Sequence, residues 1–366
     1  MNRLSALDAF SPAMSRVGTM LFKPFRLSTW LKIGFIGFLG GGVARFGSGN
    51  LNFRGPMIPP SHTPPDRISG DPLAELQRIL HSINVAQYIH AIMIALLIGA
   101  AVALIFLYLF CRFRFVLFDS VITQQPAVGR GWRLYASQAN RYFGFWLVFR
   151  LVNIATILWI IGLPIWRAYK SGALSGDDSF FVLMKLLAAI ALGAILASLV
   201  FAIISTLMKD FIMPIMALDD LALGDAWTAL WRVVASEPGA WAGYLAMKLV
   251  LTIGAGIALF VAGAVAILPG IFIVGIPAGI IALLGAVVFK MGAAAAGIAV
   301  VVVAGLVAAA GACCIYMLLT APITVFFASY AFYFFGGRYP KLGALLWPEL
   351  APFTPAPQMA GTQPLR

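Results

Sequence analysis

The stretch LVLTIGAGIALFVAGAVAILPGIFIVGIPAGIIALLGAVVF, residues 249 to 289, runs for 41 residues without one charged side chain. A second uncharged stretch follows it and covers the 47 residues from 291 to 337. A helix of about 20 apolar residues crosses the hydrocarbon core of a bilayer. Both stretches are therefore long enough to cross a membrane, and they decide the class of fold.

The rest of the sequence has the same character. Apolar residues make up 62% of the 366 residues and charged residues only 10%, which is outside the range of ordinary soluble domains. Two shorter uncharged runs cover residues 91–111 and 186–208. Lipid offers no partners to a bare backbone, and these runs lack the alternation of barrel strands. The sequence therefore predicts an all-α, polytopic helical membrane bundle.

We expect a single integral membrane domain over residues 1–340 with about six (six to eight) spans. The spans are predicted near residues 27–44, 90–111, 142–166, 180–208, 239–266 and 292–319. Pro269 and Pro277 interrupt residues 269–289, which are expected to re-enter the membrane or to form an extra span. Residues 45–89 are predicted to form an outer Pro-rich segment and a helix, and residues 341–366 a C-terminal tail.

Charge indicates the orientation. The connection after the second span carries five arginines against the single acid Asp119, and basic connections favour the cytoplasmic side. Residues 1–28 are predicted to form an amphipathic cytoplasmic helix. The residues expected on its apolar side are Leu4, Ala6, Phe10, Met14, Val17, Met20 and Leu21.

An internal repeat is the clearest pattern among the polar residues. Sliding the chain by 99 residues aligns Trp132-Arg133-Leu134 with Trp231-Arg232-Val233, Ala136-Ser137 with Ala235-Ser236, Tyr142 with Trp241 and Phe145 with Tyr244. One residue of slack aligns Asp119 with Asp219. Each unit reads as a span, an aspartate-bearing reversal, an amphipathic Trp-Arg helix and an aromatic entry into the next span. Such repeats occur in transporters and in purely structural bundles.

The pattern DFIMPIMALDD…AWTALWRVV…GAW, its earlier copy and the closing FFASYAFYFFGGRYP resemble a known group of proteins. These are bacterial polytopic proteins related to the glycerophosphodiester phosphodiesterase membrane domain and to YciC-like inner-membrane proteins. The resemblance covers about two thirds of the chain. It implies a multi-pass protein of the bacterial cytoplasmic (inner) membrane with its N-terminus inside. It implies no enzyme activity, because the phosphodiesterase chemistry belongs to a separate catalytic domain.

Two cations lie inside predicted spans at nearly equivalent positions of the repeat, namely Arg150 and Lys248. An intramembrane cation indicates a functional site by default, here for a lipid phosphate or another anion. The alternative is structural: each lies about 13 Å from a span end, from where a long side chain can reach the interface or join an internal salt bridge.

The two copies differ in charge, since the first cytoplasmic segment is basic and the second acidic. The basic residues of interest are Arg130, Arg133 and Arg141, and the acidic ones are Asp219, Asp220 and Asp225. These residues are candidates for contacts between the repeats. The alternative is two independent solvated faces, on which each ion pair contributes about 0–1 kcal/mol.

We find no pattern for a catalytic site, a cofactor or a metal. The aspartates lack a nucleophile or metal triad nearby, and His81 and His90 would lie on opposite faces of a helix. The net charge of +12 is expected of a membrane protein and does not require nucleic acid. The expected partners are membrane lipids and a protein partner or a second copy. A non-enzymatic membrane module is the leading hypothesis, a small anion transporter or lipid-handling protein the second, and a membrane-embedded lipid enzyme the third.

Overall fold

A computed structural model describes residues 4–42, 85–172 and 179–347. All regular structure in these ranges is helical. The predicted outer segment lies largely outside the described residues, as does the chain beyond residue 347. The helices are α1 (Phe10–Leu21), α2 (Leu27–Gly37), α5 (Val85–Thr123), α6 (Val128–Leu134), α7 (Ala136–Lys170), α8 (Ser179–Leu207), α9 (Met213–Asp219), α10 (Leu223–Ser236), α11 (Pro238–Gly270), α12 (Ile276–Lys290), α13 (Ala294–Gly336) and α14 (Pro340–Leu346). Three π-helical turns, η1 (Phe38–Gly42), η2 (Met208–Ile212) and η3 (Ile271–Gly275), extend or join them.

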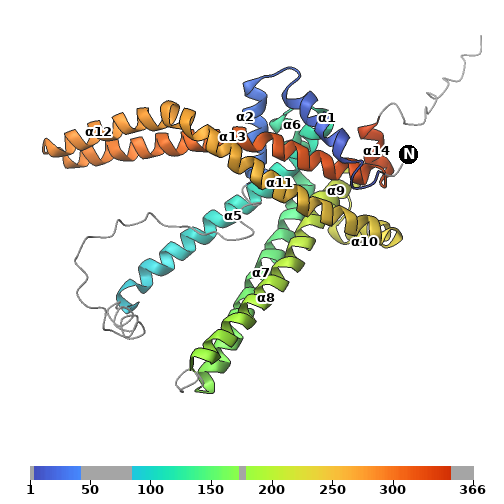
Figure 1. Cartoon of the computed structure of the whole chain (residues 1–366), viewed down its shortest axis with the longest axis horizontal. Helices are drawn as coiled ribbons and strands as arrows, with labels where there is room; N and C mark the ends of the chain where they lie inside the picture. The colour runs from blue at the N-terminus through green and yellow to red at the C-terminus, as the bar shows by residue number, and fades with distance from the viewer. Residues whose placement is uncertain (1–3, 43–84, 173–178, 348–366) are drawn as a thin grey trace, which may run out of the picture.

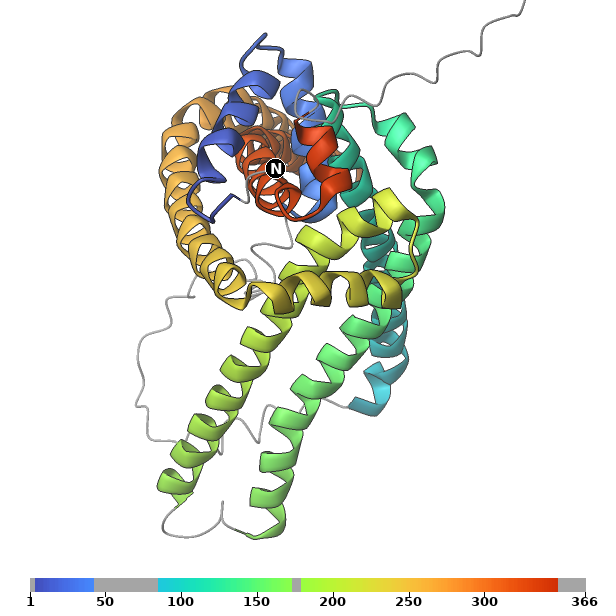
Figure 2. The same cartoon turned by 90° about the vertical axis from the view of Figure 1, so that its right-hand side faces the viewer.

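The helices form a central hub with three arms (Figure 1). The hub consists of the short helices α1, α6, α9, α10 and α14 together with the adjoining ends of α5, α7, α8, α11 and α13. The first arm is α5, the second is the hairpin of α7 and α8, and the third is α12 with the part of α13 that pairs with it. Both α1 and α14 pack against α13 in the hub (Figure 2), although they lie at opposite ends of the described chain.

Aromatic residues fill the core of the hub. The ring of Phe211 contacts those of Trp241, Tyr244 and Phe335, with centroids 4.7, 5.0 and 5.3 Å apart. All four side chains are buried. Burying one large apolar side chain stabilises a fold by about 1.5–3 kcal/mol, and edge-to-face ring pairs add to this. The hub is therefore a well-packed centre on which the arms can be held.

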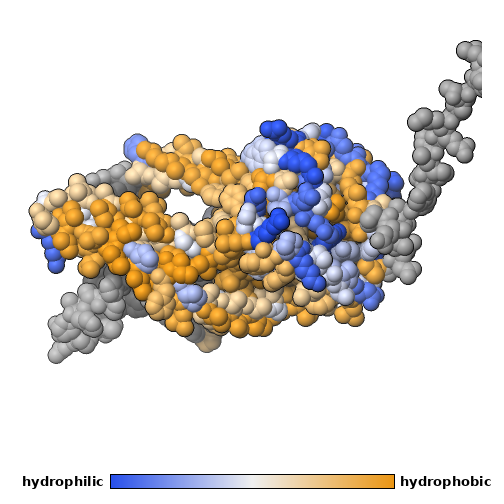
Figure 3. Space-filling view, turned by 90° about the horizontal axis from the view of Figure 1, so that it is seen from above, coloured by the Kyte–Doolittle hydropathy of each residue, from blue (hydrophilic) through white to orange (hydrophobic). Residues whose placement is uncertain are grey.

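The arms expose apolar residues along their length. Trp159 of α7 is 68% exposed, Phe260 of α11 is 78% and Leu283 of α12 is 67%. Figure 3 shows hydrophobic residues along the arms and hydrophilic ones gathered over the hub. Five helices are long and apolar enough to cross a membrane, namely Ile89–Thr123, Ala136–Lys170, Phe181–Asp219, Pro238–Lys290 and Ala294–Gly336. Leu27–Gly41 is a shorter apolar helix. An all-helical membrane protein accounts for this surface.

Residues 269–289 do not break the helix that precedes them. They continue α11 through η3 into α12, so that Pro238–Lys290 is one helical run. Pro269 and Pro277 flank the π turn η3. A proline removes one helical hydrogen bond and crowds the preceding turn, and a local π turn can absorb this mismatch without ending the helix.

The amino-terminal helix also differs in part from the prediction. Val17 and Leu21 are buried in its packed face, but Phe10 and Met14 are 39% and 49% exposed. The helix packs against α13, and Ala9 and Ala13 fill the positions closest to the core. Helical periodicity then turns residues 10 and 14 about 100° away from this face.

The expected C-terminal tail begins later than residue 341. Residues 340–346 form α14, in which Leu342 and Leu346 are buried against the hub. Gly336 lies close to this helix, since a Cβ there would lie 2.7 Å from Leu346 Cδ1. A short segment with one proline and one lysine is thus held in place by a few apolar contacts.

Candidate functional site: a buried charge cluster in the hub

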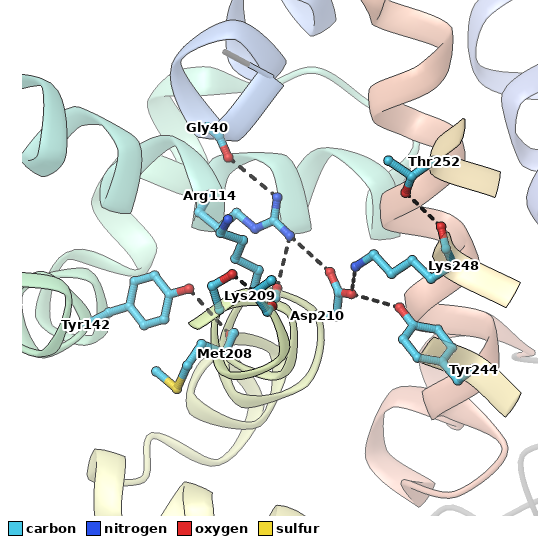
Figure 4. Close-up of polar contacts among 11 residues, drawn as sticks. Gly40, Arg114, Tyr142, Met208, Lys209, Asp210, Tyr244, Lys248 and Thr252 are labelled. Carbon is cyan, nitrogen blue, oxygen red and sulfur yellow. Dashed lines mark hydrogen bonds and ion pairs between the residues drawn. The ribbon is translucent and has the colours of Figure 1, made fainter. Parts of the chain in front are cut away.

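Asp210 lies at the centre of a buried charge cluster that joins three long helices (Figure 4). Its side chain, on η2, is 2% exposed. Arg114 of α5 approaches one carboxylate oxygen with its Nη2 at 3.4 Å. From α11, Tyr244 donates a hydrogen bond to the other oxygen at 2.7 Å, and Lys248 forms an ion pair with the same oxygen.

Arg114 also donates to two backbone carbonyls, one in η1 and one in η2. Its Nη1 donates to the carbonyl of Gly40 in η1 at 3.5 Å, and its Nη2 donates to the carbonyl of Lys209 at 3.1 Å. A Cβ on Gly40 would lie 3.0 Å from the carbonyl oxygen of Phe113, so only glycine lets η1 approach α5 this closely. Gly41 has a φ of +129°, which also favours glycine. The GFLGGG sequence therefore brings backbone acceptors to Arg114.

The π turn η2 gives the cluster its local geometry. Pro214 follows it at the start of α9 and has no N–H to donate to the carbonyl of Asp210. Wider π turns are frequent where a helix must accommodate such a defect, and they occur often at functional sites. Tyr142 of α7 donates to the carbonyl of Met208 in the same turn at 3.4 Å. The turn therefore contacts α5, α7 and α11 at once.

The cluster is suited to connect α5, η2 and α11 through fixed electrostatic contacts. Taking charges out of water costs several kcal/mol per ion unless each is paired and hydrogen-bonded. Here two cations and a phenol converge on one carboxylate, while both cations keep most of their side chains out of solvent, at 11% and 14% exposure. Among the described residues no three His, Cys, Asp or Glu side chains form a metal site. Nothing in this arrangement therefore requires a bound ion.

The structure separates the two cations that the sequence predicted inside spans. Lys248 belongs to the Asp210 cluster as an internal salt bridge. Arg150 is exposed on α7, and its guanidinium lies over the Trp146 ring at 5.7 Å from the centroid. Arg150 forms no ion pair with a described residue. The two cations therefore have different partners, Asp210 for Lys248 and the Trp146 ring for Arg150.

The structure brings together one pair of the residues predicted to connect the repeats. Nη1 of Arg141 lies 3.4 Å from a carboxylate oxygen of Asp220 and also donates to its backbone carbonyl at 3.2 Å. Both side chains are exposed, at 43% and 63%. An exposed pair of this kind contributes about 0–1 kcal/mol. The pair links α7 to the end of α9 and leaves both side chains exposed to solvent.

The other predicted residues have different partners. Arg130 forms a two-pronged contact with Asp119 of its own copy, at 2.9 and 3.1 Å, and the hydrogen bonds raise the pKa of this guanidinium. Asp219 pairs with Lys341 of α14. Arg133 and Asp225 are exposed and form no ion pair with a described residue. Among the residues predicted to connect the repeats, only Arg141 and Asp220 therefore pair with each other in the described structure.

Sequence reasoning did not single out Asp210, Arg114 or Tyr244. One signal was present, since Tyr244 and Lys248 are four residues apart and therefore share a helix face. Asp210 also stands at the end of a long uncharged run. No local pattern pairs Arg114 with Asp210, because 96 residues separate them.

Comparison with known proteins places the chain in a family. A family model matches residues 4–345, which include the hub, the arms and the Asp210 cluster. The chain belongs to DUF7544, a family of unknown function. No curated protein and no solved structure matches this DUF7544 chain.

Proposed function

We propose that this DUF7544 protein is a non-enzymatic membrane module that organises neighbouring membrane helices or lipid. The observation that carries the proposal is the arrangement of three apolar arms around one closed hub. The arms diverge, so they bury little of their surface against one another. In a membrane this surface faces lipid or the helices of other proteins.

A transporter is the alternative, and the geometry favours it less. A transporter needs polar groups that converge on a water-reachable site near the middle of the membrane. Arg150 and Lys248 were the candidates for such a site, and Lys248 is engaged by Asp210. The buried charges that were found pair with one another within the hub, where Asp210 lies between Arg114 and Lys248. Lipid handling is still compatible with Arg150, which lies on an arm.

We further propose that the hub faces the cytoplasm of a bacterial inner membrane. Four segments are predicted to lie inside: the one before α2, the connection from α5 to α7, the connection from α8 to α11 and the segment after α13. The described residues of all four lie in the hub. Their described residues carry nine basic side chains, namely Arg16, Lys23, Arg26, Arg130, Arg133, Lys209, Arg232, Arg338 and Lys341. This arrangement is compatible with six spans, in which α2 and η1 form a short first crossing. In the proposed topology the N-terminus lies inside.

The order of helices supports the proposed repeat and the proposed likeness to polytopic bacterial membrane modules. A long helix, a short Trp-Arg helix and a second long helix follow one another in α5, α6 and α7. The same order recurs in α8, α10 and α11, with α9 added between the first two.

The module can be tested by photo-crosslinking in its native membrane. A photoreactive amino acid would replace exposed leucines on two arms, Leu158, Leu196 and Leu283, and one on the hub surface, Leu134, as the matched control. The proposal expects a crosslinked protein of constant mass from at least one arm but not from Leu134. Adducts of lipid mass alone at every arm position would favour a lipid-handling role and contradict a protein-organising one.

A further inference from the structure

The turn between α1 and α2 presents aromatic and basic side chains on the outside of the molecule. All of residues 22–28 are exposed, with Phe22 at 53% and Phe25 at 62%. Lys23 and Arg26 belong to the same turn. Figure 1 shows the turn away from the outer ends of the arms. Apolar rings clustered beside polar groups on a surface mark a place of interaction, whereas scattered ones do not.

Trp30 holds the turn in one shape. Its Nε1 donates a hydrogen bond to the carbonyl of Leu21 at 2.8 Å. The rings of Phe22 and Phe25 lie against it, with centroids 5.2 and 5.7 Å away. Ring pairs at such distances attract one another. These three rings therefore form an aromatic knob whose side chains need little further ordering when a partner covers them.

The base of the aromatic knob is anchored in a small apolar core. Leu21 and Ile33 are fully buried and pack with Ala321 and Val325 of α13, and Trp30 packs against this cluster. The end of α1 and the start of α2 are thus both fixed on α13. The aromatic knob therefore projects from a firm support.

The charge around the aromatic knob is basic. Lys23 and Arg26 are exposed, and neither forms an ion pair with a described residue. The sequence holds no acid between Asp8 and Asp66, and the side chain of Asp8 is hydrogen-bonded to Ser5. A surface of this sign attracts an anionic partner.

We infer that the aromatic knob, with Lys23 and Arg26, inserts among anionic phospholipids of the leaflet in which α2 begins. Aromatic side chains concentrate at membrane interfaces, and basic residues near the surface are attracted by anionic headgroups. The knob is continuous with the apolar helix Leu27–Gly41, which is the first crossing in the proposed topology. It therefore lies where the chain enters the bilayer, a place that favours lipid over an acidic protein. The inference rests on the proposed membrane role and specifies one lipid contact within it.

The experiment measures the depth of the aromatic knob in the full chain. Phe25→Cys in a cysteine-free background would carry a nitroxide spin label. The protein would be reconstituted in vesicles of phosphatidylglycerol and phosphatidylcholine, or of phosphatidylcholine alone. Oxygen concentrates in lipid and a nickel chelate in water, so their effects on the label report its depth. In the anionic vesicles the label should lie about 5–10 Å below the headgroups, the depth typical of interfacial apolar residues.

Charge variants test the role of the headgroups. Lys23→Gln, Arg26→Gln should lower the ratio of lipid-inserted to water-exposed label about thirtyfold in anionic vesicles, since each cation near such a surface contributes about a factor of five. The matched control is Arg133→Gln, Arg232→Gln, which removes two exposed hub arginines and should leave the ratio unchanged. The charge-preserving variant Lys23→Arg, Arg26→Lys should also keep it. A misfolded protein would lower the unfolding midpoint, which these exposed substitutions should not change.

The outcomes separate this contact from the wider proposal. Greater access of nickel than of oxygen to the label in both kinds of vesicle would overturn the insertion. An equal ratio in wild type and the Gln variant at Lys23 and Arg26 would overturn the headgroup contact. Low access of both reagents would assign the aromatic knob to a second copy of the chain and overturn the lipid. Failure to find protein crosslinks on the arms would contradict the organising role but leave the depth unchanged.

Discussion

Asp210 is the residue on which the hub depends most. Its carboxylate is almost fully buried and holds Arg114 of α5 and Lys248 of α11. Replacing a whole buried ion pair by apolar residues is often neutral, but removing only one partner leaves the other charge buried and uncompensated. The effect of a substitution in this cluster on stability therefore depends on whether it leaves another charge buried without a partner.

Asp210→Asn should destabilise the protein by about 3–5 kcal/mol, because two cations then lack their acid. Thermal unfolding of detergent-purified protein checks this. Adding Lys248→Met to Asp210→Asn should recover part of the loss, with a coupling of about 0.5–3 kcal/mol. The control is Asp225→Asn, which alters an exposed carboxylate and should change stability by no more than about 0.5 kcal/mol. If the stability changes of the two substitutions were fully additive, Asp210 and Lys248 would not stabilise the fold as a pair.

At the scale of elements, glycines determine how closely the helices pack. A Cβ on Gly34 of α2 would lie 2.4 Å from the carbonyl oxygen of Met317 in α13, and one on Gly37 would lie 2.6 Å from the hydroxyl oxygen of Thr324. Backbone contact of this kind is typical of helices packed through small residues. These positions decide whether α2 can lie against α13.

Gly34→Ala should destabilise the protein by about 1–3 kcal/mol, since α2 must move away from α13. Gly18→Ala is the matched control, because nothing lies within 4 Å of a Cβ there. In the interior of α1 this control should be neutral or stabilise by up to about 1 kcal/mol. Unfolding midpoints of the two variants measure the difference, and equal midpoints would contradict the close approach.

The hairpin of α12 and α13 offers a second test of packing. A Cβ on Gly297 would lie 2.6 Å from the backbone nitrogen of Phe289, whereas one on Gly305 of the same helix would meet nothing within 4 Å. Gly297→Leu should force the hairpin apart, and Gly305→Leu should not. Spin labels at the exposed positions Leu283 and Val303 would report this as a longer mean distance in the first variant only. An unchanged distance in Gly297→Leu would contradict the hairpin.

At the scale of the whole molecule, α1, α6, α9, α10 and α14 lie in the hub, and the arms end far from it (Figure 1). The arms' outer ends therefore lie on the other side of a membrane from the hub if the arms cross it. Single cysteines in a cysteine-free background can test this. Leu134→Cys and Leu345→Cys on the hub should react with an impermeant maleimide from one side only. Tyr169→Cys and Met291→Cys at the arm ends should react from the opposite side. Labelling of all four from one side would refute the arrangement.

Much of the architecture could be predicted because helix formation in an apolar run is a local property. The uncharged runs lie within the five long helices, and the basic connection around Arg130 and Arg133 forms a short helix between two of them. Prediction failed where contacts with distant parts of the chain outweighed the local sequence pattern. Pro269 and Pro277 read as a break, but the π turn between them and the packing of Val274 on Gly311 keep the helix continuous.

The sequence by itself determined that this is an all-helical membrane protein, where its long helices run and which connections are basic. Hydropathy and periodicity act within one segment, so a single segment suffices to show them. Only the tertiary structure decided that Lys248 pairs with Asp210 and that Arg114 reaches the same carboxylate. Those partners lie 38 and 96 residues apart (248 − 210 and 210 − 114), and such pairs are chosen by the crossing of helices. The direction in which each helix leaves the hub sets which charges meet, and no local pattern contains that direction.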